Sequence, residues 1–308
     1  TQETFSELSR ANTSLYVRGI SSARLNSPLV IIDGIPTSYN SSQSLEYISA
    51  NEIESISVLK DASTQALYGI QSANGVIVVT TKRGRPGKVD INARIDQSIQ
   101  QVTTRPVFYT AAEYAEMRNQ AAFNDGIENP FTEEQLAHFR SRDLPDLYPS
   151  NDWYDRFMRD FASMQRVGVN VTGGNDRVTY FSNLNFMHQG GYFKTDQDRY
   201  NSNANNVWIN YRSNVDMRFN DYLTGFVRLS GNIKRERTPG GASNADVYGS
   251  IFQLPPTLYG PTTPQVLDPE TGEVLDPGGE VITTQAIDSP TYGLLNRTGY
   301  IRHTVTNI

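Results

Sequence analysis

Apolar and polar residues alternate almost without exception over about a dozen residues, from Val89 to Gln100. On one side of the alternation lie Val89, Ile91, Ala93, Ile95, Gln97 and Ile99, and the residues between them carry charges, amides or a hydroxyl. A period of two predicts an extended strand with one apolar and one polar face. This strand is about twice as long as the roughly 5 to 6 residues that are common in globular domains.

The same alternation returns further along the chain. The segments concerned cover 166–172, 177–187, 206–219 and 223–233, with Phe181 and Met187 blurring the second of them. Periodicity alone fits a soluble β-sandwich as well as the strands of a membrane barrel. Arg, Asp and Asn crowd the polar faces, as a watery lumen allows, and Trp208 and several tyrosines lie near predicted strand ends, as at a membrane interface. These two features favour the barrel.

The composition excludes several functional classes. The 308 residues include no cysteine, so the chain has no disulfide framework, thiolate metal site or cysteine nucleophile. Asp and Glu number 33 against 27 Lys and Arg, so the basic surface of a nucleic-acid-binding protein is absent, and we expect no nucleic-acid partner. No apolar run reaches the roughly 18 to 20 residues of a membrane-spanning helix, whereas a barrel strand needs only about 9 to 11 residues.

No catalytic or metal-binding constellation stands out. His138, His188 and His303 are far apart in the sequence and lack the spacing of metal ligands. Acidic neighbours such as Glu133 and Glu134 suit the start of a helix better than acid–base chemistry. The glycine-rich stretch 84–88 lacks the phosphate-loop pattern and is interpreted as a hinge. We predict that the chain is not an enzyme and uses no cofactor or metal ion.

A second group of signals lies between Pro28 and Gly84. It consists of PLVIIDGIP from Pro28 to Pro36, IESISVLKDAS from Ile53 to Ser63, LYG from Leu67 to Gly69 and ANGVIVVTTKRG from Ala73 to Gly84. As local structure, this segment predicts strands over 14–20, 29–32, 55–59 and 76–81, a helical turn over 51–53 and a helix over 62–68 that ends at Gly69. Asp33 and Gly34 are predicted to form a turn.

In this order and at this spacing, these runs resemble the plug domain of the TonB-dependent outer-membrane transporters, in the form found in the SusC/RagA family. The resemblance is close from about Tyr16 to Gly84 and continues more weakly through residues 151–153 and 171–181. One departure is Ile70-Gln71, where the family often has a small residue and an arginine. That departure puts only a local polar contact of the plug in doubt.

The resemblance implies an α+β plug domain over residues 1–86, followed over 87–308 by the N-terminal part of a transmembrane β-barrel of antiparallel strands. Barrels of the family have about 22 strands, of which only the first are expected here. Long loops are expected at about 103–161, with helices over 111–122 and 132–140, and at about 238–290. The second loop is interpreted as a polar, mobile loop or a disordered linker. We expect the chain to be a piece of a larger transporter.

The implied function is TonB-dependent import of an oligosaccharide or a peptide across the outer membrane of a Gram-negative, Bacteroidetes-like cell. In the family the plug gates the barrel, a SusD-like surface lipoprotein acts as a lid, and TonB pulls through an N-terminal box that is not visible in this sequence. The implied partners also include outer-membrane lipid. A dimer of transporter–lipoprotein pairs is expected.

Substrate contacts are expected on plug loops around Arg24 and around Ser38, Tyr39 and Asn40, by comparison with related siderophore receptors. A tyrosine beside hydrogen-bonding neighbours can stack on a sugar ring or a peptide group. The alternative is that Tyr39 only packs under a loop.

Two other functions stay open. A surface glycan-binding or adhesin domain without transport would bury the apolar side of residues 89–99 in a sandwich core, whereas a transporter would turn that side towards lipid. A sensory transporter would need an N-terminal signalling domain, which this sequence does not show. The exposure of the apolar side of residues 89–99 therefore separates transport from the soluble alternative.

Overall fold

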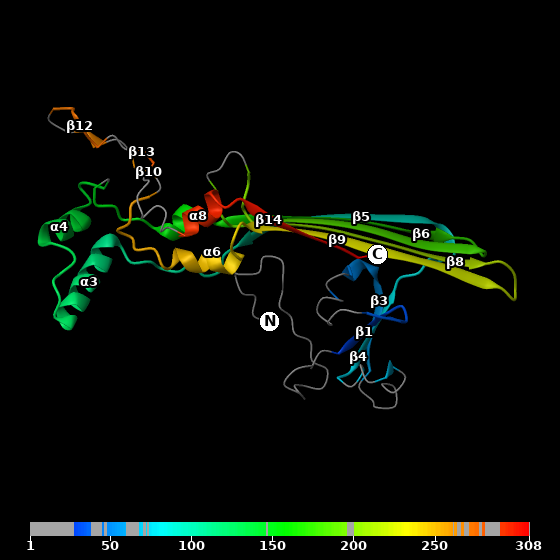
Figure 1. The fold of residues 1–308 in the computed structure, drawn as a ribbon. Helices are drawn as coiled ribbons and strands as arrows, with labels where there is room; N and C mark the ends of the chain where they lie inside the picture. Colours follow the sequence, from blue (N-terminus) through cyan, green and yellow to red (C-terminus); the bar gives the residue numbers. More distant parts are fainter. Residues whose placement is uncertain are drawn as a thin grey trace.

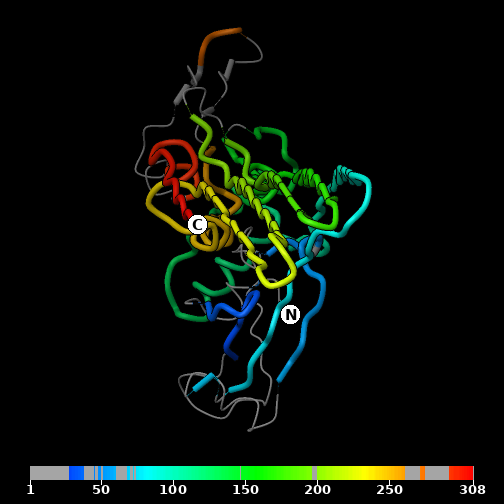
Figure 2. Tube along the Cα trace, turned by 90° about the vertical axis from the view of Figure 1, so that its right-hand side faces the viewer, coloured from blue at the N-terminus to red at the C-terminus, as the bar shows by residue number. Residues whose placement is uncertain are grey.

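The computed structural model describes residues 28–37, 45, 48–59, 68–69, 72, 74–145, 147–195, 200–260, 262–263, 266–267, 271–276, 279–280 and 290–307. Within these residues, a four-stranded sheet and a six-stranded sheet make up most of the structure (Figure 1). We call them the small sheet and the long sheet. The small sheet lies on one side of the long sheet (Figure 1, Figure 2).

The small sheet has the strand order β2-β1-β4-β3. Its strands are β1 (Leu29–Ile32), β2 (Ile35–Pro36), β3 (Ile53–Leu59) and β4 (Val76–Thr81). The central strands β1 and β4 are parallel, and their β-branched residues Val30, Ile77 and Val79 form a buried core with Ile48. The strands predicted over 29–32, 55–59 and 76–81 are confirmed, and β3 begins two residues earlier than predicted.

Tight turns and short helical turns connect these strands. Asp33 and Gly34 have φ angles of 49° and 89°, the two left-handed positions of a hairpin turn, so β1 leads directly into β2. The predicted helical turn before β3 is present as a 3-10 turn over Ala50–Glu52. Most of the helix predicted over 62–68, and the whole strand predicted over 14–20, lie outside the described residues.

The long sheet is antiparallel and has the strand order β14-β9-β8-β7-β6-β5. Its strands are β5 (Gly87–Gln101), β6 (Phe161–Gly174), β7 (Val178–Gly190), β8 (Asn205–Arg218), β9 (Thr224–Pro239) and β14 (Tyr300–Asn307). Strands β5 to β9 are 13 to 16 residues long, and each overlaps one of the predicted alternating segments. Alternation therefore predicted each of these strands, although three of the segments extend one residue past a strand end and the strands are longer overall.

The two ends of the long sheet differ in the length of their connections. At one end, residues 175–177 join β6 to β7 and residues 219–223 join β8 to β9. At the other end, the connections cover residues 102–160, 191–204 and 240–299. We call these ends the short-turn end and the long-connection end. Because β5 starts at Gly87, soon after β4 ends, the chain passes from the small sheet into the long sheet at the short-turn end (Figure 1).

The first long connection contains the two helices that the sequence predicted. They are α3 (Ala111–Asp125) and α4 (Glu133–Ser141), and both begin with a capping box, of Thr110 with Glu113 and of Thr132 with Gln135. The two helices pack through Ala111, Ala115, Leu136 and Phe139 and project from the long-connection end (Figure 1). A third helix, α5 (Trp153–Phe157), was not predicted.

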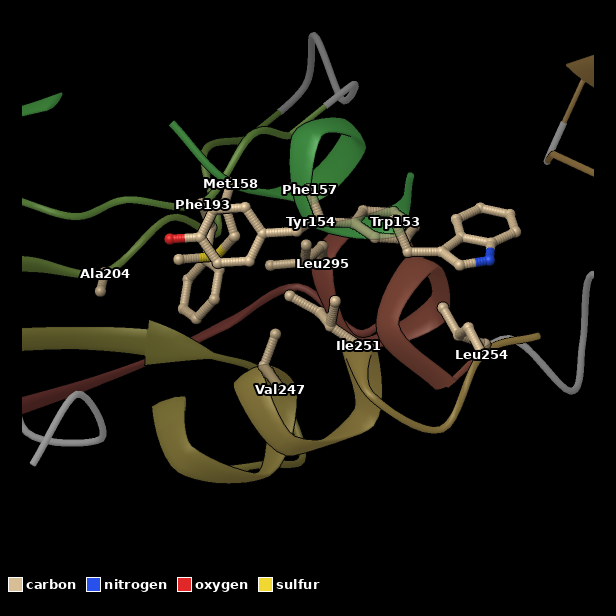
Figure 3. Close-up of a cluster of buried hydrophobic side chains, with 10 residues drawn as sticks. All are labelled: Trp153, Tyr154, Phe157, Met158, Phe193, Ala204, Val247, Ile251, Leu254 and Leu295. Carbon is tan, nitrogen blue, oxygen red and sulfur yellow. The ribbon is translucent and has the colours of Figure 1, made fainter. Parts of the chain in front are cut away.

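The last long connection corrects a prediction. Residues 240–260 are neither a polar, mobile loop nor a disordered linker, because α6 (Asn244–Ile251) buries Val247 and Ile251 against α8 (Pro290–Asn296) and α5. Ten buried residues form this core, which we call the aromatic core: Trp153, Tyr154, Phe157, Met158, Phe193, Ala204, Val247, Ile251, Leu254 and Leu295 (Figure 3). The apolar residues of α6 stand at helical spacing, but the many glycines and prolines around them hid that pattern.

Short ladders lie further along the same connection. β10 (Thr262–Thr263) pairs with β13 (Gly279–Glu280), and β11 (Val266–Leu267) pairs with β12 (Val274–Asp276). These nested pairs project from the long-connection end (Figure 1). Among the described residues, no helix has both the length and the apolar character needed to cross a membrane.

Candidate functional site between the two sheets

The side of the long sheet that faces the small sheet is polar and buried. The buried polar residues on this side are Asn183, Asn185, Asn206, Asn210, Arg212, Asn214, Asn232 and Lys234. The strand register places them together, because Asn185 lies opposite Asn210 and Asn210 lies opposite Asn232. In a soluble sandwich, the buried side of a sheet carries the apolar residues instead.

The other side of the long sheet is apolar and exposed. Ile91 and Ile95 on β5 are 65% and 78% exposed, and Leu184 and Leu229 on the central strands β7 and β9 are 55% and 57% exposed. The exposure of the apolar side of residues 89–99 distinguishes a barrel from a soluble sandwich. That side is exposed and is not buried in a sandwich core. Such a reversal of polarity is the pattern of a sheet with lipid on one side and water on the other.

Arg212 on β8 connects the long sheet to two separate parts of the small sheet. Its Nε donates to Glu52 Oε2 at 2.9 Å, and its Nη1 lies 3.5 Å from Asp33 Oδ2. Asn185 Nδ2 on β7 donates to the other oxygen of Glu52 at 3.3 Å. We call Arg212, Glu52 and Asp33 the Arg212 anchor.

A second contact lies next to the anchor. Asn214 Nδ2 donates to Thr81 Oγ1 at 2.9 Å and to the Lys82 carbonyl oxygen at 2.8 Å. Thr81 in turn donates to Asp33 through its backbone N–H at 2.8 Å and its hydroxyl at 2.6 Å. The turn after β1 and the end of β4 are thus tied to each other and to β8.

The anchor buries opposite charges that depend on each other. Glu52 is only 2% exposed and Arg212 is 7% exposed. Burial raises the pKa of the Glu52 carboxyl, while the bonds from Arg212 and Asn185 oppose that rise. A buried ion pair adds little stability compared with a well-packed apolar pair, but the loss of one partner costs about 3 to 5 kcal/mol. The anchor therefore fixes how the two sheets sit against each other.

A pocket of about 170 Å³ lies beside the anchor. It is lined by Ile48, Ser49, Arg166, Asn185, Phe186, Met187, Trp208 and Asn210, and we call it the Trp208 pocket. The side-chain oxygens of Asn185 and Asn210 are buried and accept no hydrogen bond from the part of the chain that the structure describes. An indole ring beside a guanidinium and free amide oxygens can bind groups that carry hydroxyls or amides.

Trp208 is not where the sequence placed it. The register pairs Trp208 with Lys234 on the inward side of the sheet, and the Lys234 ammonium lies 5.4 Å from the centre of the indole ring. The prediction that Trp208 marks a membrane interface is therefore wrong. The membrane interface was suggested by the position of Trp208 near a strand end. Even-numbered residues of β8 point inward, so the alternation of this strand predicts the side on which Trp208 is observed.

The site residues predicted from the sequence, Arg24, Ser38, Tyr39 and Asn40, lie outside the described residues. Sequence reasoning missed Arg212 and the Trp208 pocket. The alternation of β8 already placed Arg212 on the polar side of a strand, but it gave no sign that Glu52 lies opposite. Within the described residues, no group of three or more His, Cys, Asp and Glu side chains could hold a metal ion.

The chain between the two sheets runs close to β7. A Cβ atom built on Gly84 would lie 2.1 Å from the backbone nitrogen of Tyr180, so no larger residue fits there. The stretch 84–88, interpreted as a hinge, is thus held against the start of β7 by a requirement for glycine.

Comparisons with known proteins agree with this geometry. The family model described as "TonB-dependent Receptor Plug Domain" matches residues 3–76. TonB-dependent receptor P26 of Formosa agariphila is 37% identical over 65% of this chain and 19% of its own length. TonB-dependent receptor SusC of Bacteroides thetaiotaomicron is 27% identical over 76% of this chain and 23% of its own length.

Solved structures show the same fold. The RagAB peptide importer in the open-open state has a TM-score of 0.58 at 24% identity and matches 72% of this chain and 26% of the other. A second structure, of the RagAB peptide transporter, has a TM-score of 0.57 at 25% identity, over 73% of this chain and 26% of the other.

The matches account for both sheets. The chain spans about a fifth of the length of the curated relatives that it matches. The small sheet corresponds to the plug, the long sheet to the first strands of the barrel, and the family's location is the outer membrane, as predicted. Over the plug domain and the first strands of the barrel, the chain is thus similar to the TonB-dependent receptors of the SusC and RagA type.

Proposed function

We propose that this chain is part of a transporter that imports an oligosaccharide or a peptide across the outer membrane. The observation that carries the proposal is the reversed polarity of the long sheet, which is polar towards the plug and apolar towards the outside. A wide barrel leaks unless it is filled, and the plug supplies that filling. Relatives named as TonB-dependent receptors and as a peptide importer support this function.

The contact between plug and barrel suits a gate that has to open. Hydrogen bonds at this contact, such as those of Asn214 with Thr81 and Lys82, can be exchanged for bonds to water when the plug moves. If this contact were apolar, movement of the plug would expose apolar surface to water, and the free energy required would be much higher. The few buried charges of the Arg212 anchor then hold the closed position until a force acts.

We also propose the domain division that the sequence suggests. Residues 1–86 form the plug, and residues 87–308 form the N-terminal part of the barrel, with loops at about 103–161 and 238–290. The division is supported by the end of β4 at Thr81 and the start of β5 at Gly87.

Substrate is proposed to bind between the plug loops and the barrel wall. On the plug we propose Tyr39 with its neighbours Ser38 and Asn40, and Arg24. On the wall we propose the Trp208 pocket, whose ring and amide oxygens suit the hydroxyls of a sugar or the amides of a peptide.

The proposed partners are TonB on the periplasmic side and a SusD-like surface lipoprotein as the lid, in a dimer of such pairs. A gate in the outer membrane needs TonB or an equivalent, because no ATP is available there. Solved structures of the RagAB importer in an open-open and in a closed-closed state support an assembly with two units that open and close.

The first test is where the full-length receptor fractionates and whether a surface lipoprotein co-purifies with it after detergent extraction. Recovery from the outer membrane with a tightly bound lipoprotein is expected, together with loss of growth on one oligosaccharide or peptide when the gene is deleted. A receptor that binds a glycan at the surface but whose deletion leaves uptake of every tested nutrient unchanged would favour the adhesin or glycan-binding alternative.

A further inference from the structure

A second cavity lies at the long-connection end of the long sheet. Its volume is about 620 Å³, which is large enough for a small organic ligand. The residues that line it include Ile99, Arg159, Phe161, Ser163, His188, Gly190 and Arg237. We call it the rim cavity.

The rim cavity opens on the side of the sheet that faces away from the plug. Asn206 on β8 points towards the plug side, so its neighbour Asn205 points outward. The pairing of Asn205 with Arg237, and of Gly190 with Asn205, places both of these residues on the outward side as well. The cavity is therefore separate from the Trp208 pocket and from the plug.

The charges that line the rim cavity are positive. Arg237 is held in place, because its Nη1 donates to the Asn201 carbonyl oxygen at 2.7 Å and its guanidinium lies 5.2 Å from the centre of the Tyr300 ring. The Arg159 side chain is exposed. Neither arginine forms an ion pair with a residue that the structure describes, and none of the described residues that line the cavity is acidic.

The histidine in the wall forms hydrogen bonds through both ring nitrogens. His188 Nε2 lies 2.7 Å from the amide nitrogen of Asn205, and Nδ1 lies 2.8 Å from Gln165 Oε1. The two arginines supply the positive charge, and the amides and the Ser163 hydroxyl supply neutral hydrogen-bonding groups.

One wall of the rim cavity is apolar and continues into the outward face of the sheet. Ile99 and Phe161 line the cavity, and they are 74% and 55% exposed. Ile95 and Ile91 follow on the same side of β5. A ligand with an anionic head and an apolar tail would match the arginines and this apolar strip at once.

We propose that the rim cavity binds the phosphorylated headgroup of an outer-leaflet lipid, with an acyl chain along Ile99 and Phe161. Outer-membrane barrels have short turns on the periplasmic side and long loops outside, so the long-connection end lies at the outer leaflet. Guanidinium groups match the oxygens of phosphate in geometry and charge. The inference rests on the outer-membrane location of the proposed function, but not on any imported substrate.

The test measures lipid retained by the purified full-length receptor. Detergent-solubilised receptor is incubated with lipid A or with lipid A freed of its phosphates, and bound lipid per receptor is determined by mass spectrometry after detergent exchange. We expect the wild type to retain phosphorylated lipid A, at about one per receptor chain, and to release the dephosphorylated form.

Two variants act on the cavity in different ways. R159Q removes a charge whose side chain is exposed, so the fold should be kept, and retention should fall by about tenfold, the loss expected from one charge-assisted hydrogen bond. G190L fills the cavity without changing charge, because a Cβ atom there would meet only Ser163, at 3.7 Å and 3.9 Å. We expect a comparable loss of retention in G190L.

R118Q is the matched control, because Arg118 is exposed on α3, far from the cavity, and should leave retention unchanged. Retention that is equal in wild type, R159Q and G190L would overturn the proposal, as would equal binding of the dephosphorylated lipid. A second receptor copy or a protein partner found on this surface in place of lipid would also overturn it. Nutrient uptake that is unchanged when the gene is deleted, together with normal lipid retention by the purified receptor, would count against the proposed transport function alone.

Discussion

At the scale of single residues, Arg212 makes two of the main contacts between the barrel and the plug. One guanidinium reaches the carboxylate of Asp33, in the turn after β1, and the carboxylate of Glu52, just before β3. No local pattern in the sequence predicts this contact, because Glu52 and Arg212 are 160 positions apart. The sequence predicted the side of β8 to which Arg212 points, but pairing across the interface depends on how the two sheets dock.

We expect Arg212→Ala to destabilise the closed plug by about 3 to 5 kcal/mol, because Glu52 would stay buried without a counter-charge. The measurement is chemical unfolding of the full-length receptor, followed together with protease cleavage of the plug. Arg235→Ala on β9 is the control, since Arg235 is exposed and forms no ion pair with the described residues. Equal behaviour of the two variants would show that the anchor does not hold the plug.

Tyr39→Ala is expected to weaken uptake without lowering the amount of receptor in the outer membrane. Stacking of an aromatic ring on a sugar or peptide group contributes about 1 kcal/mol, so a several-fold rise in the substrate concentration for half-maximal uptake is expected. Tyr222→Ala serves as the control, because Tyr222 is exposed in the turn between β8 and β9. Unchanged uptake in Tyr39→Ala would mean that the residue only packs under a loop.

At the scale of elements, the alternation of apolar and polar residues predicted more of the structure than any other sequence signal. It predicted β5 to β9 and the side of each strand that faces outward, because a barrel strand has to satisfy lipid and water at every second residue. The blur at Phe181 has a physical origin, since this residue points towards the plug and is buried there. Helix α6 escaped prediction because its few apolar residues stand among glycines and prolines and become buried only against α5 and α8.

A charged residue introduced on the outward side of a strand should lower the stability of the receptor far more than one introduced on the inward side of the same strand. Leu229→Arg near the middle of β9 is expected to lower stability by about 2 to 4 kcal/mol, because the new charge would face the interior of the bilayer. Ser230→Glu, one residue further on, places a charge on the inward side at an exposed position opposite Arg212 and should be tolerated. The amount of folded receptor in the outer membrane, measured as the heat-modifiable form, distinguishes the two variants.

At the scale of the whole molecule, the aromatic core joins segments that are far apart in the sequence. Trp153 of α5 donates from its indole nitrogen to the Pro255 carbonyl oxygen at 2.8 Å, and α6 and α8 close over the same core (Figure 3). The two long loops are therefore one structural unit at the long-connection end of the strands. The sequence predicted both loops but not their contact, because long-range packing leaves no local periodicity.

Trp153→Ala is expected to loosen both loops together, with a loss of about 3 to 5 kcal/mol from the cavity left in a buried core. Hydrogen exchange should rise in α5 and also in residues 244–254, although only α5 carries the change. Phe123→Ala on α3 is the control, because that side chain is 75% exposed. Faster exchange confined to α5 would show that the loops are independent.

The few side-chain bonds between the plug and β7 and β8 also set the order in which the structure gives way under force. Within the described residues, β4 is held by continuous backbone ladders to β1 and β3, whereas the anchor and Asn214 supply only isolated bonds to the barrel. A pulling force from the periplasm would be shared by the many backbone hydrogen bonds of the small sheet at once. The isolated side-chain bonds to the barrel would instead break one after another. Under such a force, the contact between the plug and the barrel wall is therefore expected to separate before the small sheet of the plug unfolds.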